Sequence, residues 1–225
     1  MKKVAVITGT TSGIGRTIAN FYVGAGFFVA GINRRGYDIS DGHIDRNFLY
    51  DLSDPIETKA AAEEIKHQFK DRGIDVLVNN AGIMILDDLY DGAPETIATD
   101  FIAPMYLCKE LLPMFGQGGH IINIASVSGI IGDPDVPIYS ACKAGIINFT
   151  RSLAKITAPI VRVNCISPGF FDTDLVEGDV PQELIDEVPM RREAQTYEII
   201  SVIQMLQNST YITGANIVID GGLSL

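Results

Sequence analysis

Tyr139 and Lys143 are the two residues whose types and spacing most directly suggest chemistry. They stand four residues apart within residues 137–157, which read as a helix, so their side chains should share one helix face. An ammonium group beside a phenol favours the phenolate and lowers the pKa of the tyrosine. We therefore expect Tyr139 to act as a general acid or base near neutral pH, and to protonate the alkoxide that hydride transfer to a ketone creates.

A glycine-rich turn lies between a predicted strand at 4–8 and a predicted helix at 14–25. Glycine lets the backbone turn sharply and come close to a pyrophosphate. The helix that follows offers unpaired N–H groups and the positive end of its dipole to phosphates. The turn predicts a dinucleotide site, with these residues at the phosphates: Gly9, Thr11, Ser12, Gly13 and Ile14.

The elements that must position these residues alternate along the chain. Strands are expected at 4–8, 27–32, 48–50, 76–78, 121–124, 161–166 and 217–219, and helices at 14–25, from 54 onward, at 94–115 and at 137–157. This alternation predicts an α/β fold with a doubly wound, seven-stranded, mainly parallel sheet and helices on both faces. Residues 35–47, rich in glycine and small polar residues, predict a loop where a crossover helix would normally join strands two and three. No linker or repeat interrupts the pattern, so we expect a single domain over residues 1–225.

The composition excludes several classes of function. A formal net charge of −11 argues against nucleic acid as a partner, because that ligand needs a basic face. The three cysteines are far apart, and the three histidines have no ligand spacing, so no metal site is expected. The apolar run at 4–7 is too short for a signal peptide and no run is long enough to span a membrane. A reduced, cytoplasmic setting is therefore expected.

Several motifs, in order, resemble those of the short-chain dehydrogenase/reductase family. They are TGxxxGxG at 8–15, NNAG at 79–82, Ser126 ahead of YxxxK at 139–143, the segment at 164–169, and Asp-Gly-Gly at 220–222. The resemblance runs nearly from end to end. It implies a Rossmann fold and an NAD(P)-dependent oxidoreductase that moves a hydride between nicotinamide and an alcohol/ketone pair.

The same resemblance implies roles for individual residues. Ser126 would hydrogen-bond the substrate oxygen, Tyr139 would donate its proton, and Lys143 would also hold the nicotinamide ribose. Asp51 and Leu52 would lie beside the adenine. The remaining cofactor contacts would line the inner ribose and the nicotinamide amide: Asn80, Ala81, Gly82, Pro168, Gly169, Phe171 and Thr173.

One position departs from the family pattern. Asp100 replaces the family's catalytic asparagine on the long helix at 94–115, within the stretch Thr-Asp-Phe-Ile-Ala-Pro. The asparagine helps to position a water in a proton relay to the lysine, whereas an ionised aspartate accepts hydrogen bonds but cannot donate them. Its negative charge would raise the pKa of the lysine. A catalytic role for Asp100 is therefore in question.

The choice between NADP and NAD depends on the end of the second strand. An acid there would bind the adenosine ribose and select NAD, but the chain has Asn33, Arg34 and Arg35. Arginine forks suit a 2′-phosphate, so NADP is expected. NAD remains the second choice because Asp38, Asp41 and Asp45 follow closely.

Three functions fit these residues. The first is an NADPH-dependent carbonyl or 3-oxoacyl-type reductase, acting on a small-molecule carbonyl or alcohol. The others are an NAD-dependent sugar or polyol dehydrogenase, and a weakly active cofactor-binding sensor or scaffold, to which Asp100 and the short segment at 172–189 point. Apolar residues on more than one face of the helices at 94–115 and 137–157, which the family pairs between subunits, predict a homodimer or homotetramer without a membrane or nucleic-acid partner.

Overall fold

The computed structural model describes residues 1–36, 42–86, 92–173, 175 and 180–225, and seven strands in these ranges form one parallel sheet. The strand order is β3-β2-β1-β4-β5-β6-β7. The chain reverses its direction of winding between β1 and β4, and open α/β sheets bind ligands at the carboxyl ends of the strands beside such a point. The strands are β1 (Val4–Thr8), β2 (Phe28–Asn33), β3 (Arg46–Leu49), β4 (Ile74–Asn79), β5 (Phe115–Ile124), β6 (Val161–Pro168) and β7 (Asn216–Ile219).

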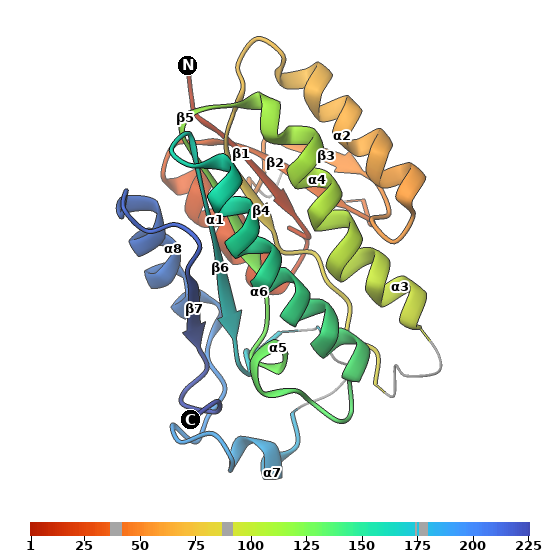
Figure 1. Ribbon diagram of the computed structural model, residues 1–225, viewed down its shortest axis with the longest axis vertical. Coiled ribbons are helices and arrows are strands. Elements are labelled where there is room, and N and C mark those ends of the chain that lie inside the picture. Colours follow the sequence, from red (N-terminus) through yellow and green to blue (C-terminus); the bar gives the residue numbers. More distant parts are fainter. Residues whose placement is uncertain (37–41, 87–91, 174, 176–179) are drawn as a thin grey trace.

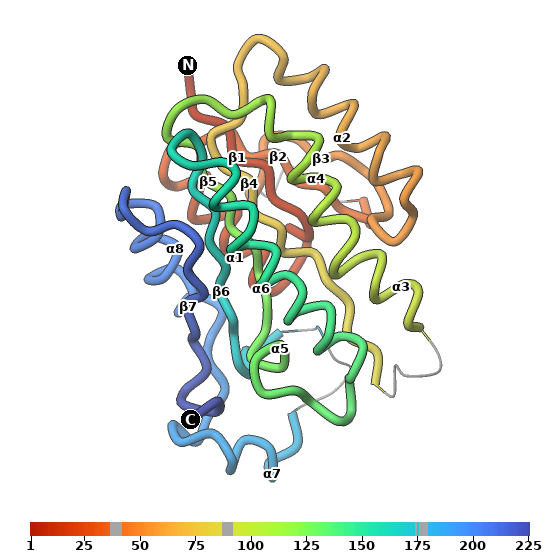
Figure 2. The backbone as a smooth tube through the Cα atoms, viewed as in Figure 1, coloured from red at the N-terminus to blue at the C-terminus, as the bar shows by residue number. Residues whose placement is uncertain are grey.

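Helices cover both faces of the sheet, as Figure 1 and Figure 2 show. α2 (Pro55–Phe69), α4 (Ala103–Leu111) and α6 (Pro137–Thr157) pack on one face, and α1 (Gly13–Gly24) and α8 (Ile199–Asn208) on the other. The shorter helical segments are α3 (Ala93–Ile97), η2 (Ala98–Ile102), η3 (Leu112–Met114), α5 (Ser128–Ile131), α7 (Gln182–Ile185) and η4 (Thr196–Glu198). The predicted doubly wound architecture is confirmed.

The strands β1, β2, β4, β5 and β6 supply side chains to two separate cores, because successive residues of a strand point to opposite faces. In β1, Val4 and Val6 pack under α2, α4 and α6, whereas Ala5 and Ile7 pack under α1 and α8. Ile44, from the connection between β2 and β3, joins the second core and is buried there.

The connection between β2 and β3 has no helix in its described residues, 34–36 and 42–45, as predicted. Residues 37–41 of the predicted loop, with Asp38 and Asp41, lie outside the described residues, as do 174 and 176–179 of the segment at 172–189. No helix within the described part of the chain is both long and apolar enough to cross a membrane.

The long helix expected at 94–115 is helical from Ala93 to Met114, but it is not a uniform α-helix. It is divided into α3, the π-helical turn η2 and α4, and it ends in the 3₁₀ turn η3. Pro104 has no N–H to give to the carbonyl four residues earlier, that of Asp100, so the backbone widens at this point. Phe115 belongs to β5, which is longer than predicted and includes three glycines that disfavour helix.

Candidate active site

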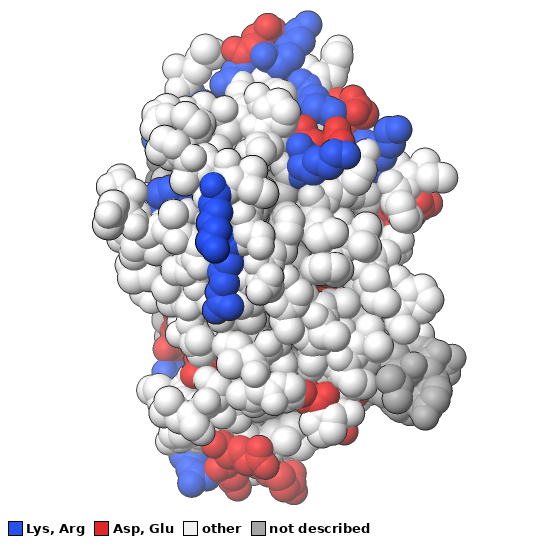
Figure 3. All heavy atoms as spheres, viewed as in Figure 1, with Lys and Arg blue, Asp and Glu red and all other residues white. Residues whose placement is uncertain are grey.

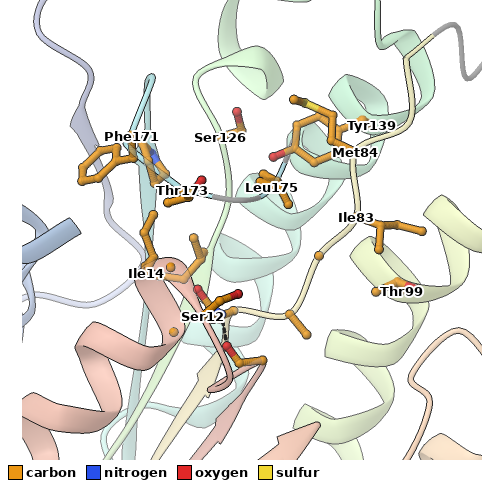
Figure 4. A pocket seen from close by; sticks show the side chains of 18 of the residues that line it. Ser12, Ile14, Ile83, Met84, Thr99, Ser126, Tyr139, Phe171, Thr173 and Leu175 are labelled. Carbon is orange, nitrogen blue, oxygen red and sulfur yellow. Dashed lines mark hydrogen bonds between the residues drawn. The ribbon is translucent and has the colours of Figure 1, made fainter. Parts of the chain in front are cut away.

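A cleft of about 1010 Å³ opens at the carboxyl ends of β1, β2, β4, β5 and β6. Figure 4 shows Ser126 and Tyr139 at one part of it and Ser12, from the start of α1, at another. Apart from Asp100, every predicted site residue lines this cleft. They are Gly9, Thr11, Ser12, Gly13, Ile14, Asn33, Arg34, Arg35, Asp51, Leu52, Asn80, Ala81, Gly82, Ser126, Tyr139, Lys143, Pro168, Gly169, Phe171 and Thr173.

The glycine-rich turn brings backbone amides to the wall of the cleft. Ser12 is the N-cap of α1, but its side chain makes no capping hydrogen bond, so the amides of the first turn keep their capacity to bind an anion. Gly9 and Gly13 have φ values of 71° and 53°, which favour glycine. A side chain at Gly15 would overlap the Gly9 carbonyl and the Asn80 amide. The turn, the start of α1 and the loop after β4 therefore pack more closely than a side chain at Gly15 would allow, and we call this glycine-rich arrangement the cradle.

Thr8 holds the two loops of this cradle together, and sequence reasoning did not single it out. Its buried Oγ1 accepts hydrogen bonds from the backbone N–H groups of Asn80 and Ala81, at 2.9 and 2.8 Å. The Asn80 side chain donates in turn to the Thr8 and Gly9 carbonyls, at 3.0 and 3.2 Å. Thr8 is the first residue of the TGxxxGxG motif, and this position was the sequence signal that could have identified it.

Asn33 lines the cleft but its side chain is already occupied. Only 3% of the residue is exposed. Its Oδ1 accepts from the Thr10 backbone N–H at 2.7 Å, and its Nδ2 donates to Thr10 Oγ1 and Asn47 Oδ1 at 2.9 and 2.7 Å. The side chain thus ties the glycine-rich turn to β2 and β3, which makes Asn33 a support for the turn.

Arg34 and Arg35 are exposed at the end of β2, where the adenosine end of a dinucleotide would lie. Arg34 Nη1 lies 3.4 Å from Glu95 Oε1 of α3, which also lines the cleft and was not predicted. Asp45, one of the acids that favoured NAD, accepts from the Val29 N–H near the start of β2. It is therefore held near the opposite end of that strand from Arg34.

The catalytic candidates come from two elements. Ser126 follows β5, and Tyr139 and Lys143 share a face of α6, as their spacing predicts. Ser126 hydrogen-bonds the Tyr139 side chain, and Lys143 Nζ lies 5.2 Å from the centre of the Tyr139 ring. All three residues are buried. A substrate oxygen beside Ser126 would therefore also meet the tyrosine hydroxyl.

The pKa of Tyr139 is not lowered as the sequence led us to expect. Burial raises it above the usual value for tyrosine, because the phenolate would lose its hydration. Lys143 acts in the expected direction, but its effect is smaller than that of burial, and Asp100 adds a further increase. The tyrosine is therefore held in its protonated form, which is the form that donates a proton to an alkoxide.

Asp100 does not line the cleft but lies directly behind it, in the π-helical turn η2. Its Oδ1 lies 2.8 Å from Lys143 Nζ, and its Oδ2 accepts from the Ile83 backbone N–H at 2.9 Å. Burial raises the pKa of Asp100. For Lys143, burial acts to lower the pKa, but the Asp100 charge is the main opposing effect and the net pKa is raised.

The residues of the cleft fit a nicotinamide dinucleotide. The glycine cradle and the uncapped start of α1 suit a pyrophosphate. Ser126, Tyr139 and Lys143 stand where redox chemistry on a carbonyl would occur, and they offer two hydroxyl groups and an ammonium for it. Among the described residues, no group of His, Cys, Asp and Glu could hold a metal ion.

Comparisons with known proteins agree with this geometry. A family model described as enoyl-(acyl carrier protein) reductase matches residues 9–224. A 3-oxoacyl-[acyl-carrier-protein] reductase of Haemophilus influenzae is 32% identical over 240 residues, covering 99% of this chain and 98% of that protein.

Two solved structures have the same fold over nearly the whole chain. An NADPH-dependent 3-quinuclidinone reductase from Rhodotorula rubra matches with a TM-score of 0.88 and 28% identity, covering 99% of this chain and 92% of that one. A 3-ketoacyl-(acyl-carrier-protein) reductase from Brucella melitensis, in complex with NADH, matches with a TM-score of 0.86 and 26% identity, covering 99% and 98%. The chain belongs to the short-chain dehydrogenase/reductase family, and it is an oxidoreductase that acts on CH–OH groups with NAD(P).

Proposed function

We propose that the chain is an NADPH-dependent reductase of ketones, of the carbonyl or 3-oxoacyl type. The observation that carries this proposal is a single cleft with Arg34 and Arg35 at the end of β2 and with Ser126, Tyr139 and Lys143 beyond β5. Guanidinium groups suit the 2′-phosphate of NADPH. Two hydroxyl groups that converge on one point suit a carbonyl oxygen that must be polarised and protonated.

The remaining cleft residues would hold the cofactor along its length. The glycine-rich turn would bind the pyrophosphate, Asp51 and Leu52 would lie beside the adenine, and Lys143 would hold the nicotinamide ribose. The inner ribose and the nicotinamide amide would contact residues that follow β4 and β6: Asn80, Ala81, Gly82, Pro168, Gly169, Phe171 and Thr173.

Ketone reduction needs a hydride at carbon and a proton at oxygen, and the bound nicotinamide supplies the hydride. Ser126 donates a hydrogen bond to the carbonyl oxygen and polarises it. The O–H bond of Tyr139 breaks, its proton goes to the substrate oxygen to complete the alcohol, and a tyrosinate remains. Lys143 stabilises that anion, because its ammonium lies over the ring.

The expected assembly is a homodimer or homotetramer built through α4 and α6. Figure 3 shows mostly uncharged side chains on the face over these helices, apart from a short stripe of Lys and Arg and a mixed charged group near its upper end. Partly exposed apolar residues that also pack against the cores lie there, including Tyr106 on α4 and Phe149 on α6. Light scattering at micromolar concentration tests this expectation, and a monomeric mass would contradict it.

The first experiment titrates the purified protein with NADPH and with NADH and follows the fluorescence of the reduced nicotinamide. The better cofactor is then supplied with a panel of small ketones, 3-oxoacyl thioesters and aldoses. Tyr139→Phe is the control, because it removes the proton donor and keeps the ring. We expect tighter binding of NADPH, turnover with a ketone or a 3-oxoacyl thioester, and loss of turnover but not of NADPH binding in Tyr139→Phe.

Other outcomes would replace the proposal. Preference for NADH together with oxidation of sugars would indicate a sugar or polyol dehydrogenase. Tight binding without turnover across the panel would indicate a cofactor-binding sensor. Turnover that survives in Tyr139→Phe would remove Tyr139 from the mechanism.

A further inference from the structure

The Asp100–Lys143 ion pair is the least solvated charge pair among the described residues, with side-chain exposures of 0% and 5%. Lys143 Nζ also donates to the Ile124 carbonyl, at 3.3 Å. At 2.8 Å the carboxylate and the ammonium form a close ion pair, and their Coulomb attraction is stronger where water is excluded. The positive charge of Lys143 is therefore balanced by the Asp100 carboxylate, which does not line the cleft, before any ligand binds.

Gly82 covers the ion pair and lies in close contact with both of its side chains. A Cβ at this position would lie 2.6 Å from Asp100 Oδ1 and 3.3 Å from Lys143 Nζ. Only a glycine lets the loop after β4 close over the pair. The next residue, Ile83, gives its backbone N–H to the other carboxylate oxygen, so both oxygens of Asp100 are engaged.

A neutral amide at position 100 would fill the same space with different electrostatics. In an Asp100→Asn variant the amide oxygen could still accept from Ile83, but the NH₂ group would face the Lys143 ammonium, donor against donor. Lys143 would then keep the Ile124 carbonyl as its acceptor, and its full charge would act on Tyr139. The charge of the aspartate, not its shape, therefore partly offsets the effect of the lysine on the tyrosine.

We propose that Asp100 is a positioning residue that acts on Tyr139 through Lys143, and that it extends catalysis of ketone reduction to higher pH by keeping Tyr139 protonated. The inference rests on the proposed function, in which Tyr139 gives up the proton. The groups that face Tyr139 and Lys143 are Asp100 from η2, Ser126 after β5, Asp133 before α6, and Cys142 on α6 itself. Of the two carboxylates, only Asp100 contacts Lys143 in an ion pair.

The supporting pKa directions are consistent with this role. Burial is the largest influence and raises the pKa of Tyr139, Lys143 lowers it, and Asp100 raises it more than Asp133 does. Removal of the Asp100 charge therefore takes away the largest of the charges that raise the pKa of Tyr139, while Lys143 and the Ser126 hydrogen bond still lower it. The tyrosinate should then form at lower pH.

The test compares Asp100→Asn with Asp135→Asn, which removes one exposed carboxylate from the connection before α6. The pH dependence of ketone reduction by NADPH is measured for both variants and for the unmodified enzyme. We expect the alkaline loss of activity to begin at least about one pH unit lower in Asp100→Asn, because a nearby charge shifts ionisation by this order. Asp135→Asn should follow the unmodified enzyme.

A second measurement needs neither substrate nor cofactor. Tyrosinate formation is followed by ultraviolet absorbance, and the contribution of Tyr139 is obtained by subtracting the titration of Tyr139→Phe. The Tyr139 tyrosinate should form at lower pH in the Asp100→Asn background than in the unmodified background. Circular dichroism confirms that each variant is folded.

The two measurements separate the possible failures. If no carbonyl is reduced but the Asp100→Asn titration shifts as expected, the proposed function fails and the electrostatic role stands. If the tyrosinate of the folded Asp100→Asn variant forms at the same or higher pH, the role of Asp100 is overturned whatever the enzyme reduces. If Asp100→Asn does not fold, tyrosinate of Tyr139 in the unmodified protein at neutral pH would overturn the inference.

Discussion

Arg34 and Glu95 form an ion pair that joins the end of β2 to the first turn of α3 across the cleft. The Nη1–Oε1 distance is 3.4 Å and the two side chains are 55% and 45% exposed. Both residues line the cleft. Any 2′-phosphate that binds at Arg34 must therefore compete with a carboxylate that already contacts the guanidinium, so Glu95 should weaken the binding of NADPH.

Replacing Glu95 with Gln should tighten NADPH binding by about two- to fivefold, which is the range expected for one exposed ion pair. NADH has no 2′-phosphate and its affinity should stay the same. Fluorescence titration at low and high salt measures both. Glu63→Gln is the matched control, since Glu63 pairs with Lys66 on α2. An equal gain for NADH would show that Glu95 does not act through the 2′-phosphate.

Gly15 and Gly24 lie on the same helix and should respond to alanine in opposite ways. At Gly15 a Cβ would overlap the Gly9 carbonyl and the Asn80 amide, so Gly15→Ala should open the phosphate cradle and abolish cofactor binding. At Gly24 a Cβ meets nothing within 4 Å, so Gly24→Ala should stabilise the protein by about 0.5–1 kcal/mol. Cofactor titration and urea unfolding measure the two effects. Normal NADPH affinity in Gly15→Ala would contradict the tight approach.

The sheet and most helices were predictable because buried parallel strands are continuous apolar runs and α6 begins at Pro137 and carries a clear apolar face. The division of the long helix at η2 was not predictable from the sequence pattern. It arises because Pro104, four residues after Asp100, has no N–H, whereas the apolar pattern of this stretch continues unchanged. The pattern of apolar residues shows which side of a helix faces the core, but it does not show where the backbone changes from α-helical to π-helical hydrogen bonding.

The site was predictable where motifs place a residue and unpredictable where burial decides its chemistry. Spacing put Tyr139 and Lys143 on one face, yet the direction of the Tyr139 pKa follows from burial and from Asp100, which is remote in sequence. The partner of Arg34 likewise came from another element. These relationships depend on which loops meet at the strand ends, which no single segment specifies.

Asn33 should be required for the stability of the glycine-rich turn. Asn33→Ala removes the acceptor for the Thr10 N–H and the donor to Asn47 Oδ1, and leaves buried polar groups without partners. We expect a loss of about 1–3 kcal/mol in the free energy of unfolding, together with weaker binding of NADPH and NADH alike. Urea unfolding and cofactor titration measure this. If only NADPH binding is weakened, Asn33 contacts the 2′-phosphate and is not merely a support.

His120 should make the protein sensitive to acid. The residue is fully buried in β5, its Nε2 accepts from Asn164 Nδ2 at 3.2 Å, and its Nδ1 has no hydrogen-bond partner among the described residues. Burial, aided by the charge of Arg162, lowers its pKa from 6.5 to about 3. The folded state therefore keeps the imidazole neutral down to about pH 3, whereas the imidazole of the unfolded chain takes up a proton near pH 6.5.

The sign of the effect follows from this difference. Because the unfolded state takes up a proton near pH 6.5 and the folded state only near pH 3, the contribution of His120 to stability is complete above pH 6.5 and is lost as the pH falls through this window. The total is on the order of a few kcal/mol.

In His120→Gln, the free energy of urea unfolding should fall less steeply between pH 6.5 and about pH 4 than in the unmodified protein. His67→Gln, at an exposed position on α2, should leave the slope unchanged. An equal slope in His120→Gln would mean that the imidazole is protonated in the folded protein, and that burial and the charge of Arg162 do not hold it in its neutral form.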